Sequence, residues 1–394
     1  MIYTAMLVIA GTASGLITGL TPALHPNTVI FLSLPLAARY NPVLVLPFIT
    51  STAVSHSVVN HIPSILVGAP DPDSALAAIP GKKMLLEGKA LEAVRIGLEG
   101  GLYAALFAIP LLAVSLISLK GLYTVSKPYL PFIISFLFMA MVIDNRNVMY
   151  SSVVAGISGM AGITAFSSRS INSSMVLFPL LTGLFGASTM ISSLKSREIP
   201  EQREVEKETE IPVRGSIIGA VSGLIAGLIP GLGPSGTISI FARYLKSKKN
   251  FMSALGGINT SDALFSLLAL YIIGRPRSGA AIAVQKLSDI GVYMFLKLTG
   301  IILVSIALAY LAGRSIAPRL VNLYKSMDKE KLIKTLLAAL PVGIVATTGL
   351  GGLGIFLTAT GIGLIADKFN VRKSVCMGCI ILPVILHMFG VSAL

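Results

Sequence analysis

Two short stretches of the chain combine proline and glycine in a pattern that could hold an anion at membrane depth. Residues 223–237 read GLIAGLIPGLGPSGT, and residues 15–26 read GLITGLTPALHP. Neither can form an uninterrupted helix, because proline removes a backbone donor and glycine lets the chain reverse. A helix that restarts after such a break presents unpaired N–H groups and about half a positive charge, which suits an anionic oxygen. Interrupted helices of this kind mark substrate and ion sites in secondary transporters.

The two stretches are related by an internal duplication. At an offset of 208 residues, 15–26 aligns with 223–234, and eight of the twelve positions are identical, including both prolines. Agreement of this extent exceeds chance even among apolar segments. We therefore predict a first membrane repeat over 1–194, a charged linker over 195–214 and a second membrane repeat over 215–394.

Side chains near these breaks are the predicted substrate ligands. Hydroxyl and amide groups that follow the prolines can donate hydrogen bonds, and two arginines that flank Pro276 could neutralise a carboxylate or a phosphate. The arginines could equally cap the preceding span, and small polar residues often serve helix packing in membranes. The predicted substrate-binding set is Pro22, Ala23, His25, Asn27, Thr28, Gly231, Gly233, Ser235, Gly236, Thr237, Arg275 and Arg277.

A second set of polar residues could bind a coupling ion. Residues 259–262 align at the same offset with 51–54, and small amides and hydroxyls in an irregular helix can supply oxygens for sodium. Asp262 is ionisable at membrane depth, where burial is costly. The predicted ion-coupling set is Ser51, Thr52, His56, Asn259, Thr260, Ser261 and Asp262. For these residues helix packing is the open alternative, and for the histidine it is a neutral ring bonded to a backbone carbonyl.

The composition places these residues in a multi-pass protein of the cell membrane. Of 394 residues, 54% are hydrophobic and 12% charged, and the mean hydropathy is +0.84. These values are typical of an integral membrane protein in contact with the lipid bilayer. The basic excess, 31 Lys and Arg against 17 Asp and Glu, lies between apolar spans. It therefore indicates topology rather than a nucleic-acid partner.

The apolar spans predict an all-α polytopic fold with the same plan in both halves. Each half begins with a hairpin of two incomplete helices, and about five transmembrane helices follow it. The apolar residues 2–22 begin with no basic region or obvious cleavage site, so we interpret the N-terminus as a retained first span. The hairpins lie at 2–38 and 215–245, and the spans lie at 43–67, 96–118, 128–143, 148–166, 172–193, 251–273, 288–313, 333–348, 351–366 and 374–391.

The charges of the connecting segments predict how the halves are related. If each hairpin re-enters from one side, each half has an odd number of crossings, and the second half is inverted. Placing the linker inside puts 23 of the 31 basic residues on that side and 7 outside. Such an excess of Lys and Arg is typical of the cytoplasmic segments of membrane proteins. We predict inverted repeats with the linker in the cytoplasm and both termini outside. Hairpins that cross completely would make the halves parallel.

Motifs for soluble enzyme chemistry are missing from the sequence. The four histidines form no HExxH pattern, and His56 and His61 fall on different faces of a helix. No GxSxG or Walker sequence appears, so an ion gradient is the expected energy source. Cys376 and Cys379 form a CxxC inside an apolar helix, which does not favour a redox or metal site. We expect no cofactor and no metal site, with sodium or a proton as coupling ion.

The sequence resembles a known family of transporters. The paired GLxxGLxPxLxP stretches, and 68–74 leading into PGK at 80–82 and EGKA at 87–90, resemble the large membrane subunit of tripartite tricarboxylate transporters. The resemblance covers nearly the whole chain. It implies a carboxylate permease that works with a small membrane subunit and an extracytoplasmic binding protein. The chain departs from the pattern in being shorter than typical members and in having Ala23 and His25 where glycines are expected.

The predicted function is therefore secondary active transport of a small carboxylate or related organic anion. One alternative is translocation of a phosphorylated, polyprenyl-phosphate-type lipid carrier, because residues 234–237 are similar to a motif of a membrane family implicated in recycling such lipids. An alternative of another class is an intramembrane histidine-dependent enzyme. A homodimer is compatible with the sequence.

Overall fold

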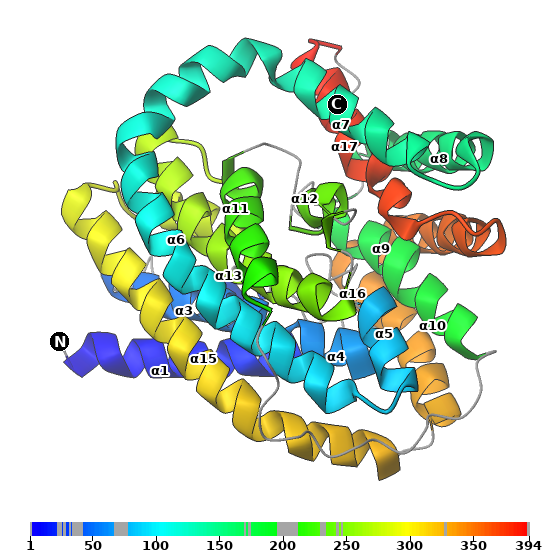
Figure 1. Cartoon of the computed structure of the whole chain (residues 1–394), viewed down its shortest axis with the longest axis horizontal. Coiled ribbons are helices and arrows are strands. Elements are labelled where there is room, and N and C mark those ends of the chain that lie inside the picture. The colour runs from blue at the N-terminus through cyan, green and yellow to red at the C-terminus, as the bar shows by residue number, and fades with distance from the viewer. Residues whose placement is uncertain are drawn as a thin grey trace.

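The computed structural model shows an all-α protein, and none of the residues that it describes lies in a strand (Figure 1). It describes residues 2–21, 26, 29–30, 33, 42–66, 78–168, 171, 175–194, 212–228, 234–241, 244–245, 247–326 and 329–391.

The first half contains helices that match most of the predicted apolar segments. They are α1 (Ile2–Leu20), α3 (Pro42–Val59), α4 (His61–Leu66), α5 (Ala78–Leu86), α6 (Ala90–Ser126), α7 (Leu130–Ile143), α8 (Val148–Phe166), α9 (Leu177–Leu181) and α10 (Ser188–Leu194). A 3-10 turn, Lys127–Tyr129, joins α6 to α7, and a π-helical segment, Thr182–Ala187, joins α9 to α10.

The second half contains α11 (Val213–Leu228), α12 (Pro234–Phe241), α13 (Lys248–Ile273), α14 (Gly279–Leu287), α15 (Val292–Ser326), α16 (Lys329–Lys368) and α17 (Gly378–Met388). The end of the span predicted at 251–273 is confirmed. Helix α13 ends at Gly274, whose φ of 69° is a left-handed conformation that glycine adopts readily. The side chain of Ser278 then caps the start of α14 by accepting from the backbone N–H of Ala281.

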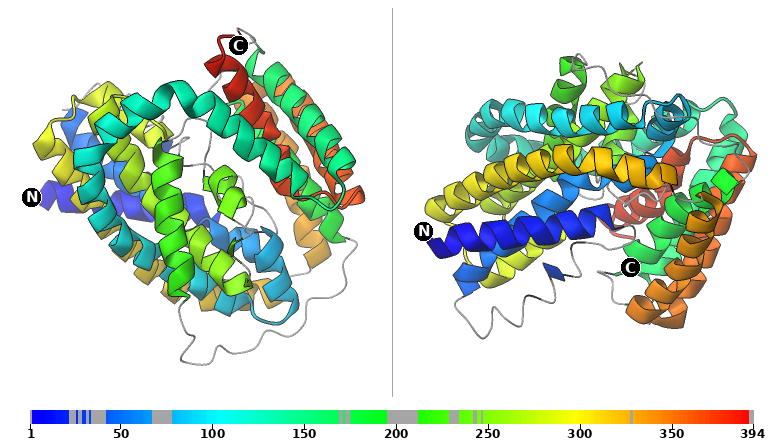
Figure 2. Two further views of the ribbon diagram at one scale, coloured as in Figure 1. Left: turned by 45° about the horizontal axis from the view of Figure 1, so that its top comes forward. Right: turned by 90° about the horizontal axis from the view of Figure 1, so that it is seen from below.

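The helices form two bundles, each with its own apolar core (Figure 2). The first bundle contains α1, α3–α6, α11 and α13–α15, and the second contains α7–α10, α16 and α17. Each bundle draws on both halves of the sequence. The long helix α6 leads from the first bundle to α7 in the second, as Figure 1 shows. Helix α12 packs on α11 and α13 and also contacts α7 and the 3-10 turn Lys373–Met377, so it lies where the bundles meet.

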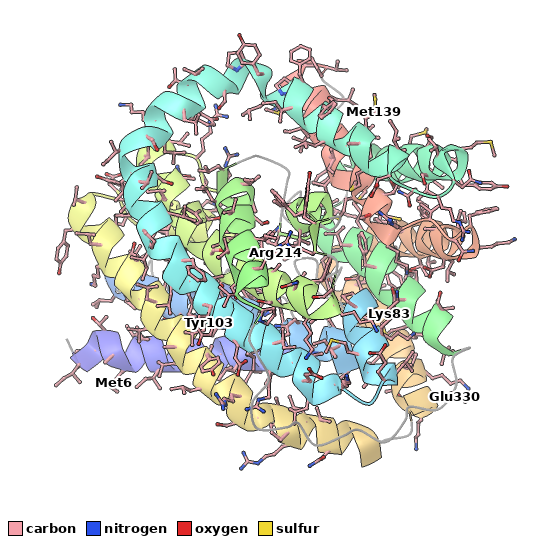
Figure 3. The ribbon with its side chains drawn as sticks, viewed as in Figure 1. Met6, Lys83, Tyr103, Met139, Arg214 and Glu330 are labelled. Carbon is pink, nitrogen blue, oxygen red and sulfur yellow. The ribbon has the colours of Figure 1, made fainter. Side chains whose placement is uncertain are left out.

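Six described helical segments are long and apolar enough to cross a membrane. They are Ile2–Leu20, Ala90–Ile143, Val148–Phe166, Lys248–Ile273, Val292–Leu323 and Ile333–Lys368. Large apolar side chains such as Met6 and Met139 are exposed on the outside of the molecule, where lipid would cover them (Figure 3). The chain is therefore a multi-pass membrane protein.

Two pairs of predicted spans join into longer helical segments. The segments at 96–118 and 128–143 lie within Ala90–Ile143, because only the short turn Lys127–Tyr129 separates α6 from α7. The segments at 333–348 and 351–366 are both part of α16, which is kinked at Gly349 with φ 68° and ψ −169°. The apolar pattern gave their positions, but it could not show that the chain stays helical between them.

The span predicted at 43–67 is interrupted at Asn60, between α3 and α4. Pro63 explains the interruption, because it has no N–H to donate to the carbonyl of Val59 four residues earlier. The amide of Asn60 still donates to the carbonyl of His56 at 2.9 Å. The interruption therefore begins after an intact helix.

Helix pairs at the repeat offset pack through small residues. A Cβ on Gly15 of α1 would lie 2.4 Å from the carbonyl oxygen of Thr52 in α3, and one on Gly223 of α11 would lie 2.1 Å from Oγ of Ser261 in α13. Such distances are far below van der Waals contact, so these positions require glycine. Close backbone approach through small residues is the usual way in which membrane helices associate. The pairs α1–α3 and α11–α13 are thus equivalent contacts.

Candidate functional site

In the second half, described helices lie on either side of the predicted break, and the first half ends its helix at the equivalent residue. Helix α1 ends at Leu20 and α11 at Leu228, which differ by the repeat offset of 208. After a gap, α12 begins at Pro234, a residue well suited to the first turn of a helix. In the first half the equivalent Pro26 is also helical. In both halves, therefore, a helix ends at a matching position, and the matching prolines beyond it are helical.

Many of the predicted substrate ligands fall between these helix ends. Ser235 and Gly236 lie in the first turn of α12, and Thr237 of the same helix is fully buried. Pro22, Ala23, His25, Asn27, Thr28, Gly231 and Gly233 lie outside the described residues. Their role as ligands stays a prediction.

Polar contacts across the first bundle join the two halves near several predicted ion ligands. Asn259 of α13 donates from Nδ2 to Oδ1 of Asn60 at 3.2 Å, and both are buried. Ser305 of α15 donates to Oγ of Ser51 in α3 at 2.9 Å. Neither Asn60 nor Ser305 belongs to the residue sets predicted from sequence. No local pattern signals a contact between residues 254 positions apart.

Thr260 and Ser261 use their hydroxyl groups on backbone carbonyls. Oγ1 of Thr260 lies 2.8 Å from the carbonyl oxygen of Gly101 in α6. Oγ of Ser261 lies 2.6 Å from the carbonyl oxygen of Gly257 and 3.1 Å from that of Gly219 in α11. These bonds tie α13 to its neighbours, as the packing alternative expects. An oxygen bonded in this way keeps lone pairs, so the contacts do not decide against an ion.

Other buried oxygens on the same helices have no hydrogen-bond partner among the described residues. Oγ1 of Thr50, Oγ1 of Thr52 and Oγ of Ser55 lie on α3, and Oδ1 of Asn259 lies on α13. Buried polar atoms are nearly always satisfied, so unsatisfied oxygens call for an explanation such as an ion or water. Thr50 and Ser55 were not among the residues predicted from sequence. Their place on the α3 segment that contains Ser51 and Thr52 is the signal that could have found them.

The two histidines of this region are held by hydrogen bonds to different helices. Nδ1 of His56 lies 3.1 Å from Oγ1 of Thr18 in α1, and that hydroxyl donates to the carbonyl of Gly15 at 3.1 Å. The tautomer of His56 that fits both contacts donates from Nδ1. Nε2 of His61 lies 3.4 Å from the carbonyl oxygen of Val94 in α6, a weak contact. The rings have separate partners, which does not favour a shared catalytic role.

Asp262 follows Ser261 on α13 and is half-buried. Oγ of Ser266, one turn later, donates to Oδ1 of Asp262 at 3.4 Å. Such a bond is long and compatible with either charge state of the carboxyl group. Asp262 is therefore placed in the first bundle, next to the contacts that join α11 and α13.

The arginines of the predicted substrate set differ in environment. Arg275 is exposed, whereas Arg277 is half-buried beside Tyr123 at the end of α6. Nε and Nη2 of Arg277 are buried and have no hydrogen-bond partner among the described residues. Burial lowers the pKa of the Arg277 guanidinium, and the hydrogen bond with Tyr123 opposes this change. A guanidinium with two unused donors can bind a carboxylate in bidentate fashion.

The structure does not bring all predicted ligands to one point. Asn259 lies near the middle of α13, and Arg277 lies beyond the end of this helix. The helical residues between Asn259 and Ile273 alone span about 21 Å. The polar contacts of α3 and α13 therefore form one candidate site, and Arg277 marks a second position beyond the end of α13.

The interrupted helices, the buried polar contacts and the apolar exterior define a multi-pass membrane transport protein. The chain matches the Tripartite tricarboxylate transporter TctA family over residues 5–378, and it therefore belongs to this family. It is also 30% identical over 395 residues to an uncharacterized protein of Methanocaldococcus jannaschii, covering 97% of this chain and 98% of that protein. No solved structure gave a significant match.

Family membership confirms the predicted resemblance and the class of protein. This is a family of transporter components, so the protein is not an enzyme, and the histidine-dependent alternative is not supported. In tripartite transporters, the membrane component of this family works with a small membrane subunit and a periplasmic binding protein.

Proposed function

We propose that this protein is a secondary active transporter that moves a small carboxylate or related organic anion across the membrane. The observation that carries the proposal is the pair of helices that end at Leu20 and Leu228, with helical prolines at the equivalent positions 26 and 234. Helix ends within a membrane offer unpaired N–H groups to an anion. Uptake of labelled carboxylates into vesicles that contain the protein tests this function.

We further propose that the two halves are inverted relative to each other. Helices α6 and α13 begin at the same end, because Lys249 pairs with Glu92 at 2.6 Å. Helix α15 begins at the opposite end, where Phe295 stacks on Tyr271 near the end of α13, with ring centroids 4.8 Å apart. Since α15 occupies the place of α6 in the duplicated sequence, the equivalent helices run in opposite directions.

The pair α3 and α13 supports the same relation. Near its start, α3 packs through Ile49 on Ala283 of α14, which follows the end of α13. Just beyond the other end of α3, His61, the first residue of α4, contacts Val94 near the start of α6. Helix α3 therefore runs from the far end of α13 towards its beginning. Opposite directions for two equivalent helix pairs are what an inverted duplication requires.

For the energy source, we propose coupling to a sodium or proton gradient. Support comes from the buried oxygens of Thr50, Thr52, Ser55 and Asn259, because hydroxyl and amide oxygens are suitable ligands for a hard cation. Arg277 is the proposed partner for the carboxylate near the membrane surface. We also propose that this protein works with a small membrane subunit and a periplasmic binding protein, as other members of its family do. Formation of a homodimer stays a prediction.

Labelling single cysteines tests the inverted arrangement. In a variant without Cys376 and Cys379, we introduce one cysteine at Ser196 or one after Leu394. We expect a membrane-impermeant thiol reagent to label the first only from the cytoplasmic side and the second only from outside. The basic residues on the linker side give this orientation. Labelling of both positions from the same side would contradict inversion.

A further inference from the structure

A buried lysine lies where the second bundle joins the two halves of the chain. Lys373 begins the 3-10 turn Lys373–Met377, and its side chain is only 7% exposed. It lies against α10 of the first half and the end of α16 of the second, two helices that pack together (Figure 1). Lysine is seldom buried to this extent unless its charge is balanced.

Oxygen atoms surround the ammonium group. Nζ of Lys373 donates to Oγ of Ser188 at 2.7 Å and to Oγ1 of Thr189 at 2.7 Å. It also lies 3.0 Å from Oδ2 of Asp367, which accepts a second bond from Ser192 at 2.6 Å. An ammonium has three N–H bonds, and here each has an oxygen partner at ordinary hydrogen-bond length.

The protein directs lone pairs of these oxygens towards one point. The hydrogen of the Ser188 hydroxyl goes to the carbonyl of Leu184 at 2.5 Å, so its oxygen can only accept from Lys373. Helix α16 approaches α10 closely at Gly363, where a Cβ would lie 2.5 Å from Oγ of Ser188. The π-helical segment Thr182–Ala187 ends directly before Ser188, and such segments often occur at functional sites.

The two other basic residues near Asp367 in the sequence form no hydrogen bond or ion pair with its carboxylate in the described part of the chain. Arg372 donates to Oδ2 of Asp144 at 2.6 Å, and Lys368 is exposed. Cys376 is a buried thiol of the same turn and is close enough to interact electrostatically with Lys373. Asp367 therefore depends on Lys373 for its countercharge, and loss of the ammonium would leave this part-buried carboxylate uncompensated.

We propose that Ser188, Thr189 and Asp367 form a monovalent-cation site that the chain fills with its own ammonium group. Two hydroxyl oxygens and a carboxylate oxygen are the ligands that a primary ammonium ion or a potassium ion takes. The site lies in the second bundle, apart from the oxygens of α3 and α13, and it does not depend on the proposed transport function.

Chemical rescue of Lys373→Ala tests the proposal. Truncation removes the ammonium and leaves a space beside the three oxygens. We expect the purified variant to unfold several degrees below the wild type when heating is followed by light scattering. Millimolar methylammonium chloride should restore most of this loss, because the small ion can occupy the vacated position. Choline chloride at equal ionic strength should not, because its quaternary ammonium has no N–H to donate.

The wild type and Lys368→Ala are the matched controls, and neither should respond to methylammonium. Equal effects of methylammonium on Lys373→Ala and the wild type would overturn the proposal. So would a Lys373→Met variant as stable as the wild type, because a neutral side chain of similar length would then serve as well.

If Lys373→Ala cannot be purified, the proposal is tested by comparing the thermal stability of the single variant Lys373→Met with that of the double variant Lys373→Met, Asp367→Asn. Neutralising the carboxylate should recover stability that Lys373→Met loses, because the uncompensated charge is removed. A double variant no more stable than Lys373→Met would show that Asp367 does not require a cation, and it would overturn the proposal.

Discussion

Replacing Arg277 with glutamine should weaken carboxylate binding at least about tenfold, whereas the same change at Arg275 should leave binding nearly intact. Arg277 has two buried nitrogens without a partner in the described part of the chain, while its neighbour Arg275 is exposed. A hydrogen bond to a charged group contributes about 1.5–3 kcal/mol, and about 1.4 kcal/mol corresponds to a factor of ten in affinity.

The measurement is the concentration of citrate that protects each purified variant against thermal unfolding. Arg277→Lys keeps the charge but loses the planar pair of donors, so its affinity should fall between those of the wild type and Arg277→Gln. Equal citrate affinities for Arg277→Gln and Arg275→Gln would show that Arg277 only caps the end of α13.

Replacing Asp262 with asparagine should abolish accumulation of substrate against its gradient while leaving exchange partly intact. A carboxylate within a membrane-spanning helix costs desolvation free energy, which a role in binding a coupling ion would explain. Asp262 lies beside Ser261, at the contact between α11 and α13. An ion bound to α13 at this position would therefore lie next to α11. Asparagine keeps the size of the side chain and removes its charge.

Uptake and exchange are compared in vesicles with the same amount of each variant. Asp289→Asn, on the exposed connection between α14 and α15, serves as the control and should accumulate substrate like the wild type. If Asp262→Asn still concentrates substrate, the carboxylate has no part in coupling.

Local sequence signals were sufficient for the helices and their breaks. Proline and glycine have local effects on the backbone, so the ends of α11 and α13 and the start of α12 could be predicted from residue types. The duplication gave the equivalence of α1 with α11 before any contact was known. By contrast, the interruption at Asn60 was overlooked although Pro63 signals it, because the apolar pattern continues through both residues.

Contacts between distant helices could not be predicted in this way. Periodicity shows which residues share a face of a helix, but it does not show which helix that face meets. Thr260 was predicted as an ion ligand because its residue type suits one, and its contact with the carbonyl of Gly101 follows only from the packing of α6 on α13. The cluster around Lys373 was missed for the same reason, since Ser188 and Asp367 are far from each other in the sequence.

Transport in vesicles tests the central claim most directly. The protein is reconstituted with and without the partner subunits of its transporter, and labelled citrate or succinate is added outside under an inward sodium or proton gradient. We predict that a labelled carboxylate accumulates, that dissipating the gradient stops accumulation, and that unlabelled carboxylate exchanges with the labelled one. Failure of every carboxylate to enter under either gradient, with a labelled polyprenyl phosphate crossing the same membranes, would contradict the proposed function and support the lipid-carrier alternative.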